Sequence, residues 1–200
     1  LLASGLLDTV YRNIYPIAIG KLFSASNLGH YTRAQHFSEF PSSNITGILQ
    51  RVTYPVLCEI QNDDTRLAGF YRKFLKLSAF IVFPLMTVLS AVAQPLVNKM
   101  LGPQWEFCGL LLQIICFSMM WHPIHAINLN LLLVKGRPDL SLRLEIIKKA
   151  LGVSVLCITA PYGLIVMCYG QIFNSLVALT INTYYTGKLI HVGFFRQMRD

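Results

Sequence analysis

Polar residues concentrate in the segment "YTRAQHFSEFPSSN", residues 31–44, within an otherwise apolar chain. On a helix with 3.6 residues per turn, five polar side chains of this segment and the residues after it share one arc: Gln35, Glu39, Ser42, Thr46 and Gln50. Five more lie beside that arc or further round: His36, Ser43, Arg33, Asn44 and Arg51. The opposite arc is apolar and passes through Ile45, Ile48 and Val52. Guanidinium groups of this kind bind anions, and amides and hydroxyls bind polar ligands.

The segment is long enough to cross a membrane, so the polar arc needs a place away from lipid. A charged side chain at the bilayer centre costs about 2.5 kcal/mol or more. Near the start of the chain, Asp8 and Arg12 are four residues apart on one helix face and can pair. Charges on two neighbouring spans predict a hydrated cavity between them. A purely structural reading remains open, because Asp8 and Arg12 could form a structural pair and Arg33 could extend to the interface.

The composition is that of a multi-pass membrane protein. Hydrophobic residues make up 54% of the chain and the mean hydropathy is +0.52. Charged residues make up 13%, about half the share in a soluble domain. The longest uncharged run, 150–187, would form a helix of roughly 57 Å, whereas a bilayer core is about 30 Å thick. We therefore expect two spans there, separated at "APYGL".

Six segments are predicted as membrane-spanning helices. They are residues 1–23, 31–59, 67–94, 107–134, 139–160 and 164–188. The apolar runs are too long, and alternate too little, for β-barrel strands. The predicted fold class is an all-α integral membrane protein, with one six-helix transmembrane bundle over residues 1–200.

The net charge of +8 follows from membrane topology. In the six-span arrangement twelve basic residues fall on one side: Arg66, Arg72, Lys73, Lys76, Lys135, Arg137, Arg143, Lys148, Lys149, Lys188, Arg196 and Arg199. The other side has Lys21 and Lys99. Lys and Arg collect in cytoplasmic loops, so residues 60–66 and 134–143 are predicted to be cytoplasmic, and no nucleic-acid partner is needed.

The remaining polar residues of the spans favour structural roles. His122 and His125 lack the third ligand and the nearby carboxylates that a metal site would have. We interpret these histidines, and Asn174 and Asn182, as making hydrogen bonds between helices. The segment "RPDLSLRLEIIKK" is interpreted as lying in the cytoplasmic interface. The prolines within the spans are expected to bend the helices. No metal, cofactor or catalytic signature is found.

Several phrases resemble a known transporter family. "LGHYTRAQHFSEFPSSNITGILQRVTYPVLCEIQND" resembles the eighth helix of Wzx-type polysaccharide exporters of the multidrug/oligosaccharidyl-lipid/polysaccharide (MOP) superfamily. "YRKFLKLSAFIVFPLM", "WHPIHAINLNLLLVKGRPDLSLRLEIIKK" and "INTYYTGKLI" resemble its lipopolysaccharide-biosynthesis branch. The resemblance covers almost the whole chain. It implies one lobe, helices 7–12, of a MATE/MOP-like transporter. The chain also begins without Met, so we expect a piece of a longer protein whose N-terminal lobe is missing here.

The resemblance implies transport of an undecaprenyl-pyrophosphate-linked oligosaccharide across the bacterial inner membrane by alternating access. The pyrophosphate would then bind the arginines of the first two spans, Arg12, Arg33 and Arg51. The sugars would bind Gln35, Asn44 and Gln50, and the polyprenyl tail would stay in membrane lipid. The candidates for a coupling proton or sodium ion are Asp8, His36 and Glu39.

Two other functions remain open. One is half of a MATE-type drug exporter, although such cavities favour acidic or aromatic residues for cationic drugs. Here the first two spans contain three arginines and two acidic residues, Asp8 and Glu39, and this excess of positive charge favours an anionic substrate. The other is a membrane-embedded polysaccharide-modifying enzyme. Such enzymes need a large outer loop or a catalytic His/Asp cluster, and the longest outer connector predicted here is 95–106.

Overall fold

The computed structural model describes residues 2–190, with side chains for residues 9, 11 and 13–189. The helices are α1 (Leu2–Leu22), α2 (Ala25–Glu59), α3 (Asp64–Leu101), α4 (Glu106–Met119), α5 (His122–Val134), α6 (Pro138–Thr159) and α7 (Leu164–Ile190). Two 3-10 turns, Pro103–Trp105 and Ala160–Tyr162, complete the connections, and the described residues contain no strand. Three segments are long and apolar enough to cross a membrane: α3, the stretch holding α4 and α5, and α7. The predicted all-α membrane bundle is confirmed.

Capping residues and a glycine set where the helices begin and end, and the connectors are shorter than the sequence predicted. The Ser24 hydroxyl accepts a hydrogen bond from the amide of Asn27, so α2 begins at Ala25 instead of 31. Asp63 caps α3 in the same way. At its other end α3 continues through Pro95 to Leu101 and stops at Gly102, whose φ of 95° favours glycine. The expected outer connector of 95–106 therefore shrinks to 102–105.

The predicted fourth span is interrupted in the middle, where α4 ends and α5 begins. Met120 and Trp121 lie between the two helices and keep right-handed helical backbone angles. Pro123 follows, and it lacks the N–H that would continue the hydrogen-bond ladder. The chain therefore follows one bent helical path, as expected for a proline inside a span.

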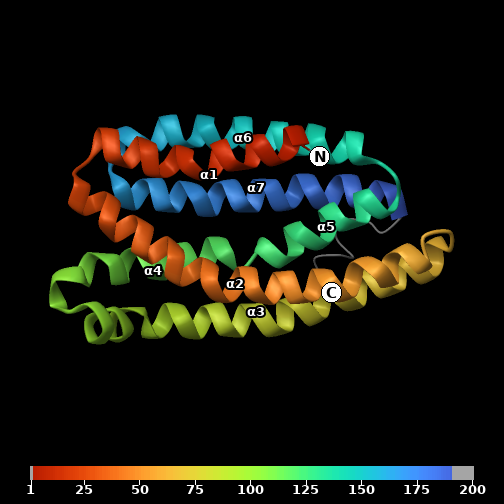
Figure 1. The fold of residues 1–200 in the computed structure, drawn as a ribbon, viewed down its shortest axis with the longest axis horizontal. Coiled ribbons are helices and arrows are strands. Elements are labelled where there is room, and N and C mark those ends of the chain that lie inside the picture. Colours follow the sequence, from red (N-terminus) through yellow and green to blue (C-terminus); the bar gives the residue numbers. More distant parts are fainter. Residues whose placement is uncertain (1, 191–200) are drawn as a thin grey trace.

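The helices form two groups that lie side by side (Figure 1). In one, α2 packs against α3, α4 and α5; in the other, α1 and α6 lie near α7. Contacts of α4 and α5 with α7 join the groups. The connectors 60–63 and 135–137 lie at the right-hand end of Figure 1, and 102–105 and 160–163 at the left-hand end. The two sets of connectors predicted on opposite membrane sides thus lie at opposite ends of the bundle.

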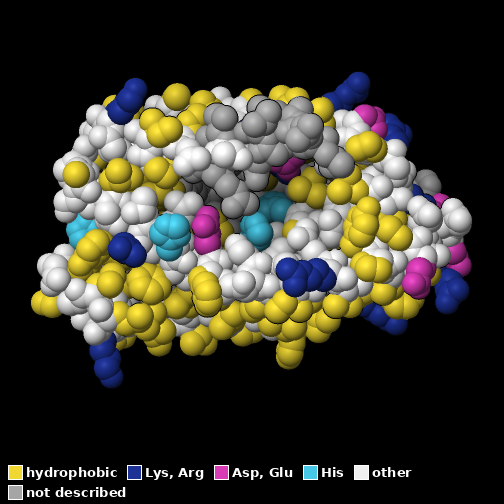
Figure 2. All heavy atoms as spheres, viewed as in Figure 1, with side chains coloured by type: hydrophobic (Ala, Val, Ile, Leu, Met, Phe, Trp, Pro, Cys, Tyr) yellow, Lys and Arg dark blue, Asp and Glu magenta, His cyan; other side chains and the backbone are white. Residues whose placement is uncertain are grey.

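The outer surface is rich in exposed apolar side chains, as a surface facing lipid would be. Phe80 on α3 is 80% exposed and Phe173 on α7 is 60% exposed. Hydrophobic side chains crowd the α3 edge in Figure 2, whereas charged and histidine side chains gather around a hollow in the middle of the face shown. On α2, Ile48 and Val52 of the predicted apolar arc are 62% and 58% exposed. The polar and apolar arcs of α2 therefore face different surroundings.

The segment predicted to lie in the cytoplasmic interface forms the first half of α6. It continues without a break into the apolar second half, up to Thr159. Leu144 is buried and Glu145, Lys148 and Lys149 are only partly exposed, so this half packs into the bundle. Glu145, Lys148 and Lys149 turn toward the inside of the protein, where Glu145 pairs with both lysines, whereas Arg137, Asp139 and Arg143 of the same segment are exposed. The placement of this segment in the cytoplasmic interface stays a prediction.

Candidate functional site

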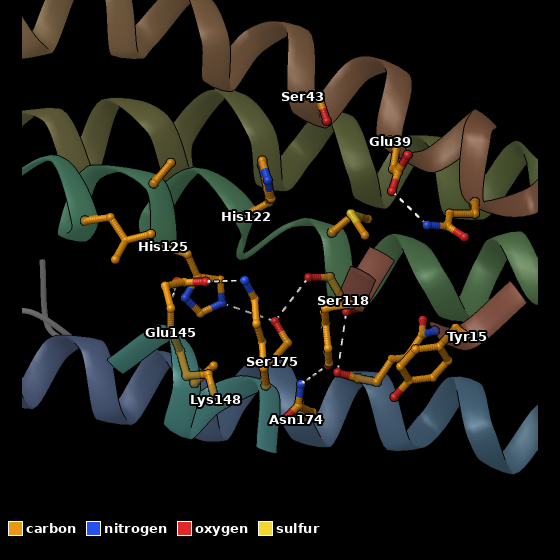
Figure 3. Close-up of a pocket in the computed structure, with 18 of the residues that line it drawn as sticks. Tyr15, Glu39, Ser43, Ser118, His122, His125, Glu145, Lys148, Asn174 and Ser175 are labelled. Atoms are coloured by element: carbon orange, nitrogen blue, oxygen red, sulfur yellow. Dashed lines mark hydrogen bonds and ion pairs between the residues drawn. The ribbon is translucent and has the colours of Figure 1, made fainter. Parts of the chain in front are cut away.

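A cavity of about 500 Å³ lies between the two helix groups. Side chains from α1, α2, α4, α5, α6 and α7 line it, so every α-helix except α3 contributes. Figure 3 shows Tyr15 and Glu39 toward one end, and His125, Glu145 and Lys148 toward the other. The cavity thus combines an aromatic and amide-rich end with a charged end.

Tyrosines and side-chain amides form the first end. Gln171 of α7 donates a hydrogen bond to the Tyr31 hydroxyl (2.5 Å), and Asn174 donates to the Tyr11 hydroxyl (3.3 Å). The Tyr15 side chain is 6% exposed, and its buried hydroxyl has no hydrogen-bond partner among the described residues. A buried hydroxyl that borders a cavity without a partner can bind a polar ligand there. Aromatic rings beside amides are suited to sugars.

Three charged residues of α6 form the second end. The Glu145 carboxylate contacts the ammonium of Lys148 at 2.5 Å and that of Lys149 at 3.3 Å. The side chains of the two lysines are 11% exposed and that of Glu145 is 17% exposed. One carboxylate is therefore shared by two largely buried ammonium groups.

His125 joins three helices at the same end of the cavity. The Asn182 amide nitrogen lies 3.2 Å from His125 Nδ1, and the His125 Nε2 lies 3.3 Å from the Ser175 hydroxyl. An amide nitrogen only donates, so Nδ1 accepts and Nε2 carries the hydrogen. Ser175 in turn donates to the backbone carbonyl of Ser118 (3.3 Å). The predicted interhelical hydrogen bonds of His125 and Asn182 are confirmed.

The second histidine of the pair bonds to a different helix. His122 Nδ1 lies 3.3 Å from the Thr46 hydroxyl on α2, and that hydroxyl donates to the Ser42 carbonyl (2.6 Å). Thr46 therefore accepts from Nδ1–H of His122. Within the described part of the chain, no group of three His, Cys, Asp or Glu side chains could hold a metal ion.

Comparison with known proteins assigns the chain to a family. The family described as "Polysaccharide biosynthesis protein" matches residues 1–109, more than half of the 200 residues. The chain belongs to the polysaccharide biosynthesis protein family. With its apolar helices, this family member is a multi-pass membrane protein.

Three curated relatives of this polysaccharide biosynthesis protein are similar over most of the chain. "Uncharacterized membrane protein in cps region" of Klebsiella pneumoniae is 27% identical over 186 residues, 91% of this chain and 37% of that protein. "Lipopolysaccharide biosynthesis protein WzxC" of Escherichia coli K12 is 24% identical over 183 residues, 92% of this chain and 37% of that protein. "Teichuronic acid biosynthesis protein TuaB" of Bacillus subtilis is 26% identical over 140 residues, 70% of this chain and 29% of that protein.

These percentages mean that the chain spans about a third of the length of the curated relatives it matches. No solved structure matches the chain.

Three of the residues predicted for the site in this family member line the cavity. Gln35, Glu39 and Gln50 do so from α2, together with Ser43 of the same polar face. Gln35 donates a hydrogen bond of 2.9 Å to the Glu39 carboxylate. Two other members of the polar arc are buried against neighbouring helices: Ser42 and Thr46.

Four predicted residues of α2 lie on its exposed side and do not line the cavity. They are Arg33, His36, Asn44 and Arg51. Asn44 donates to the backbone carbonyl of Phe40 (2.7 Å). Figure 2 shows basic side chains over α2 beside the hollow. The remaining two predictions, Asp8 and Arg12, have side chains outside the described residues, and so does their expected ion pair.

The charged residues of α6 are the main part of the cavity that sequence reasoning missed. Lys148 and Lys149 were counted among the cytoplasmic topology charges, and Glu145 was placed in the interfacial segment. Their spacing carried a signal, because residues three and four apart share one helix face and an apolar stretch follows directly. The sequence contains no signal for the contact between Gln171 and Tyr31, because these two residues are 140 positions apart.

Proposed function

We propose that the full-length protein moves undecaprenyl-pyrophosphate-linked oligosaccharide repeat units across the bacterial inner membrane, for surface polysaccharide biosynthesis. The observation that carries the proposal is a polar cavity of about 500 Å³ inside the membrane bundle of a polysaccharide biosynthesis protein. The activity is transport by alternating access rather than catalysis. The names of WzxC and TuaB, which refer to lipopolysaccharide and teichuronic acid biosynthesis, support a substrate of this class.

The chemistry of the cavity suits an oligosaccharide head group. Amide groups of Gln35, Gln50, Gln171 and Asn174 offer both donors and acceptors to sugar hydroxyls. The unpartnered Tyr15 hydroxyl and the neighbouring tyrosine rings add a surface against which a sugar can pack. The polyprenyl tail would remain outside, along the exposed apolar side chains of the bundle.

A second lobe of the same protein would complete the transport path. The chain corresponds to about a third of its relatives' length, so most of the transporter lies elsewhere. The exposed side of α2, with Arg33, Asn44 and Arg51, would meet that lobe and extend the polar path for sugar and pyrophosphate; Arg12 on α1 would add to it. A proton or sodium ion bound by Glu39, with Asp8 and His36 as the other candidates, would couple transport to an ion gradient.

The bundle would be oriented with connectors 60–63 and 135–137 in the cytoplasm. Arg66, Lys135 and Arg137 lie at this end, whereas Lys21 and Lys99 lie at the other. Lys148 and Lys149 face the cavity and no longer count toward the asymmetry. The remaining basic residues still favour the same end, which supports the orientation.

The decisive experiment measures translocation by the full-length protein in vesicles. Purified protein is reconstituted with a fluorescent lipid-linked oligosaccharide, and a membrane-impermeant reagent reports how much sugar is accessible outside. We expect protein-dependent exposure of sugar from the inner leaflet, and loss of surface polysaccharide in a strain that lacks the gene. Unchanged polysaccharide in that strain, accompanied by sensitivity to cationic drugs, would overturn the proposal in favour of a drug exporter.

A further inference from the structure

The outer side of α3 begins with basic side chains and continues as an apolar stripe. Arg66, Lys73 and Lys76 are exposed, and the exposed residues Leu77 and Phe80 follow on the same side of the helix. Steps of three, four or seven residues separate these positions, and such steps keep side chains on one helix face. The opposite side of α3 packs into the bundle, and Figure 1 shows α3 along one edge of the molecule. The stripe therefore faces the surroundings of the protein.

The charges of α3 are spaced to match the thickness of a membrane. No charged residue lies between Lys76 and Lys99, and the helix formed by residues 77–98 is roughly 33 Å long. The hydrocarbon core of a bilayer is about 30 Å thick and has the lipid head groups on either side. When α3 crosses the membrane, Lys76 is therefore at the edge of the core. Lys73, one turn further out, is then at the level of the lipid phosphates.

The first turns of α3 have an excess of positive charge. From Thr65 to Leu101 the helix contains five basic residues and no acidic one. The two acids that precede this stretch have other roles, because Asp63 caps the helix and Asp64 contacts Lys135 from the α5–α6 connector. A cluster of basic residues directly beside a membrane-spanning helix attracts anionic lipid.

Between two of these basic residues the helix surface is open. Gly69 is exposed, lies between Arg66 and Lys73 on the outer side, and an added Cβ would meet nothing within 4 Å. The Lys73 ammonium lies 5.3 Å from the centre of the Phe70 ring, and this contact keeps the charge beside the helix. A lipid head group can therefore approach the backbone at Gly69 with a positive charge on either side.

An apolar groove continues from the basic residues toward the membrane interior. Its volume is about 560 Å³, and it is lined by Lys76, Leu77, Ala79 and Phe80. The order along the helix is thus positive charge, open surface at Gly69, and apolar groove. A phospholipid has the complementary order, because its anionic phosphate is followed by acyl chains.

We propose that the outer side of α3, from Arg66 to Phe80, binds one anionic phospholipid of the membrane. The phosphate contacts Lys73, the head group covers Gly69, and an acyl chain lies in the groove against Leu77 and Phe80. The inference goes beyond the proposed function and does not depend on it, because α3 does not line the cavity.

The test identifies the molecule that contacts position 80 in a bilayer. The full-length protein, with the photoreactive residue benzoylphenylalanine in place of Phe80, is reconstituted in vesicles of equal parts phosphatidylglycerol and phosphatidylcholine. After illumination, mass spectrometry measures how much of each lipid is attached. We expect an excess of phosphatidylglycerol of about fivefold for each basic residue in contact. The same photoreactive residue in place of Phe173, an exposed apolar position of α7, is the control and should show no such excess.

Two substitutions locate the site on α3. Lys73→Gln should lower the phosphatidylglycerol excess about fivefold. Gly69→Glu adds a negative charge where there is space for it and should abolish the excess, whereas the uncharged Gly69→Gln should retain most of it. Lys99→Gln, at the other end of the helix, should change nothing. If Lys73→Gln inserts poorly, the comparison of Gly69→Glu with Gly69→Gln decides alone.

Three results would overturn the inference. The first is an equal lipid ratio at positions 80 and 173, which would mean that α3 has no preference of its own. The second is an excess that survives in Lys73→Gln and Gly69→Glu. The third is attachment of position 80 to another segment of the protein, which would make this surface a protein contact. All three are read without measuring oligosaccharide translocation, so they do not bear on the proposed function.

Discussion

The hydroxyl of Ser42 on α2 donates a 2.9 Å hydrogen bond to the backbone carbonyl of Met119, the last residue of α4. In an unbroken helix this carbonyl would accept the amide hydrogen of residue 123. Residue 123 is a proline and has none. One residue earlier in the chain, the carbonyl of Ser118 accepts a hydrogen bond from the Ser175 hydroxyl of α7. Hydroxyls from two other helices therefore satisfy carbonyls at the α4–α5 break.

Replacing Ser42 should destabilise the protein through this carbonyl. Ser42→Ala should lower the free energy of unfolding by about 1–3 kcal/mol, the usual penalty for a buried group that loses its partner. In the Pro123→Ala background residue 123 again has an N–H, so the same substitution should cost much less. Denaturant unfolding of the full-length protein in detergent, analysed as a double-mutant cycle, measures the difference. Additive effects of the two substitutions would contradict this explanation.

Gly152 should be intolerant of a side chain. A Cβ added there would lie 2.0 Å from the Tyr11 hydroxyl and 2.8 Å from the ring carbon that bears it, so the Tyr11 side chain must leave its place between α1 and α6. Gly152→Ala should therefore lower the melting temperature of the full-length protein by several degrees, despite the better helix propensity of alanine. The control is Gly47→Ala on α2, where nothing lies within 4 Å of the added atom. Equal melting temperatures for the two variants would show that the Tyr11 side chain adapts freely.

The sequence predicts the helices of this protein well and the cavity only in part. Long uncharged runs and a charge asymmetry are local patterns, and they are sufficient to place the helices within a few residues. The phase of α2 is also readable, since Gln35, Glu39 and Gln50 share an arc and all line the cavity. Two helix ends differ from the prediction. The Ser24 cap starts α2 at Ala25, earlier than predicted, and α3 continues through Pro95 to Leu101.

What sequence reasoning could not supply is the pairing of helices distant along the chain. Arg33 and Gln35 are two residues apart, yet Gln35 lines the cavity and Arg33 is exposed, because α4 and α5 pack against one side of α2 and leave the other side uncovered. In the sequence alone, a basic residue that follows a connector looks the same whether its side chain faces the cytoplasm or a cavity. Lys148 and Lys149 were assigned to the first class for this reason.

Arg33 provides a test of whether the exposed side of α2 contacts substrate. If it binds pyrophosphate beside the second lobe, Arg33→Ala should reduce polysaccharide export per inserted molecule about tenfold or more. Arg33→Lys should restore it only partly, because an ammonium group lacks the bidentate geometry of a guanidinium. Export is measured relative to the amount of protein in the membrane. A lysine variant that behaves as wild type, with an alanine variant that merely accumulates less, would assign Arg33 to the membrane interface.

Glu39 tests the ion-coupling proposal independently of the substrate. Glu39→Gln keeps a side chain that can bond with Gln35 and removes the negative charge that a proton or sodium ion needs. We expect the variant to translocate oligosaccharide in vesicles without responding to an imposed ion gradient, while the wild type accelerates. Glu106→Gln, an exposed acid in the first turn of α4, is the matched control. A gradient response that survives in Glu39→Gln would exclude Glu39 as the coupling residue.

The proposed orientation predicts which side of the membrane each end of the bundle faces. Lys99→Cys lies near the end of α3 and Arg137→Cys lies between α5 and α6, at opposite ends of the molecule. Both positions are exposed, whereas the Lys135 side chain is 18% exposed and contacts Asp64. In intact cells, a membrane-impermeant thiol reagent should label Lys99→Cys and leave Arg137→Cys unlabelled until the cells are opened. Labelling of both from the same side would contradict the six-span arrangement.

The shared carboxylate of α6 also has a consequence for how the protein is assembled in the membrane. Among the described residues α6 is not one of the helices that could enter a bilayer by length and composition alone. A lysine at the centre of a lone span costs about 2.5–3.5 kcal/mol on insertion scales, and Glu145 offsets only part of this for the pair. The apolar helix α7 follows after one short turn, Ala160–Tyr162, and packs against α6. Biosynthesis should therefore hold α6 at the translocon until α7 emerges from the ribosome, so that the two helices leave it together as a hairpin.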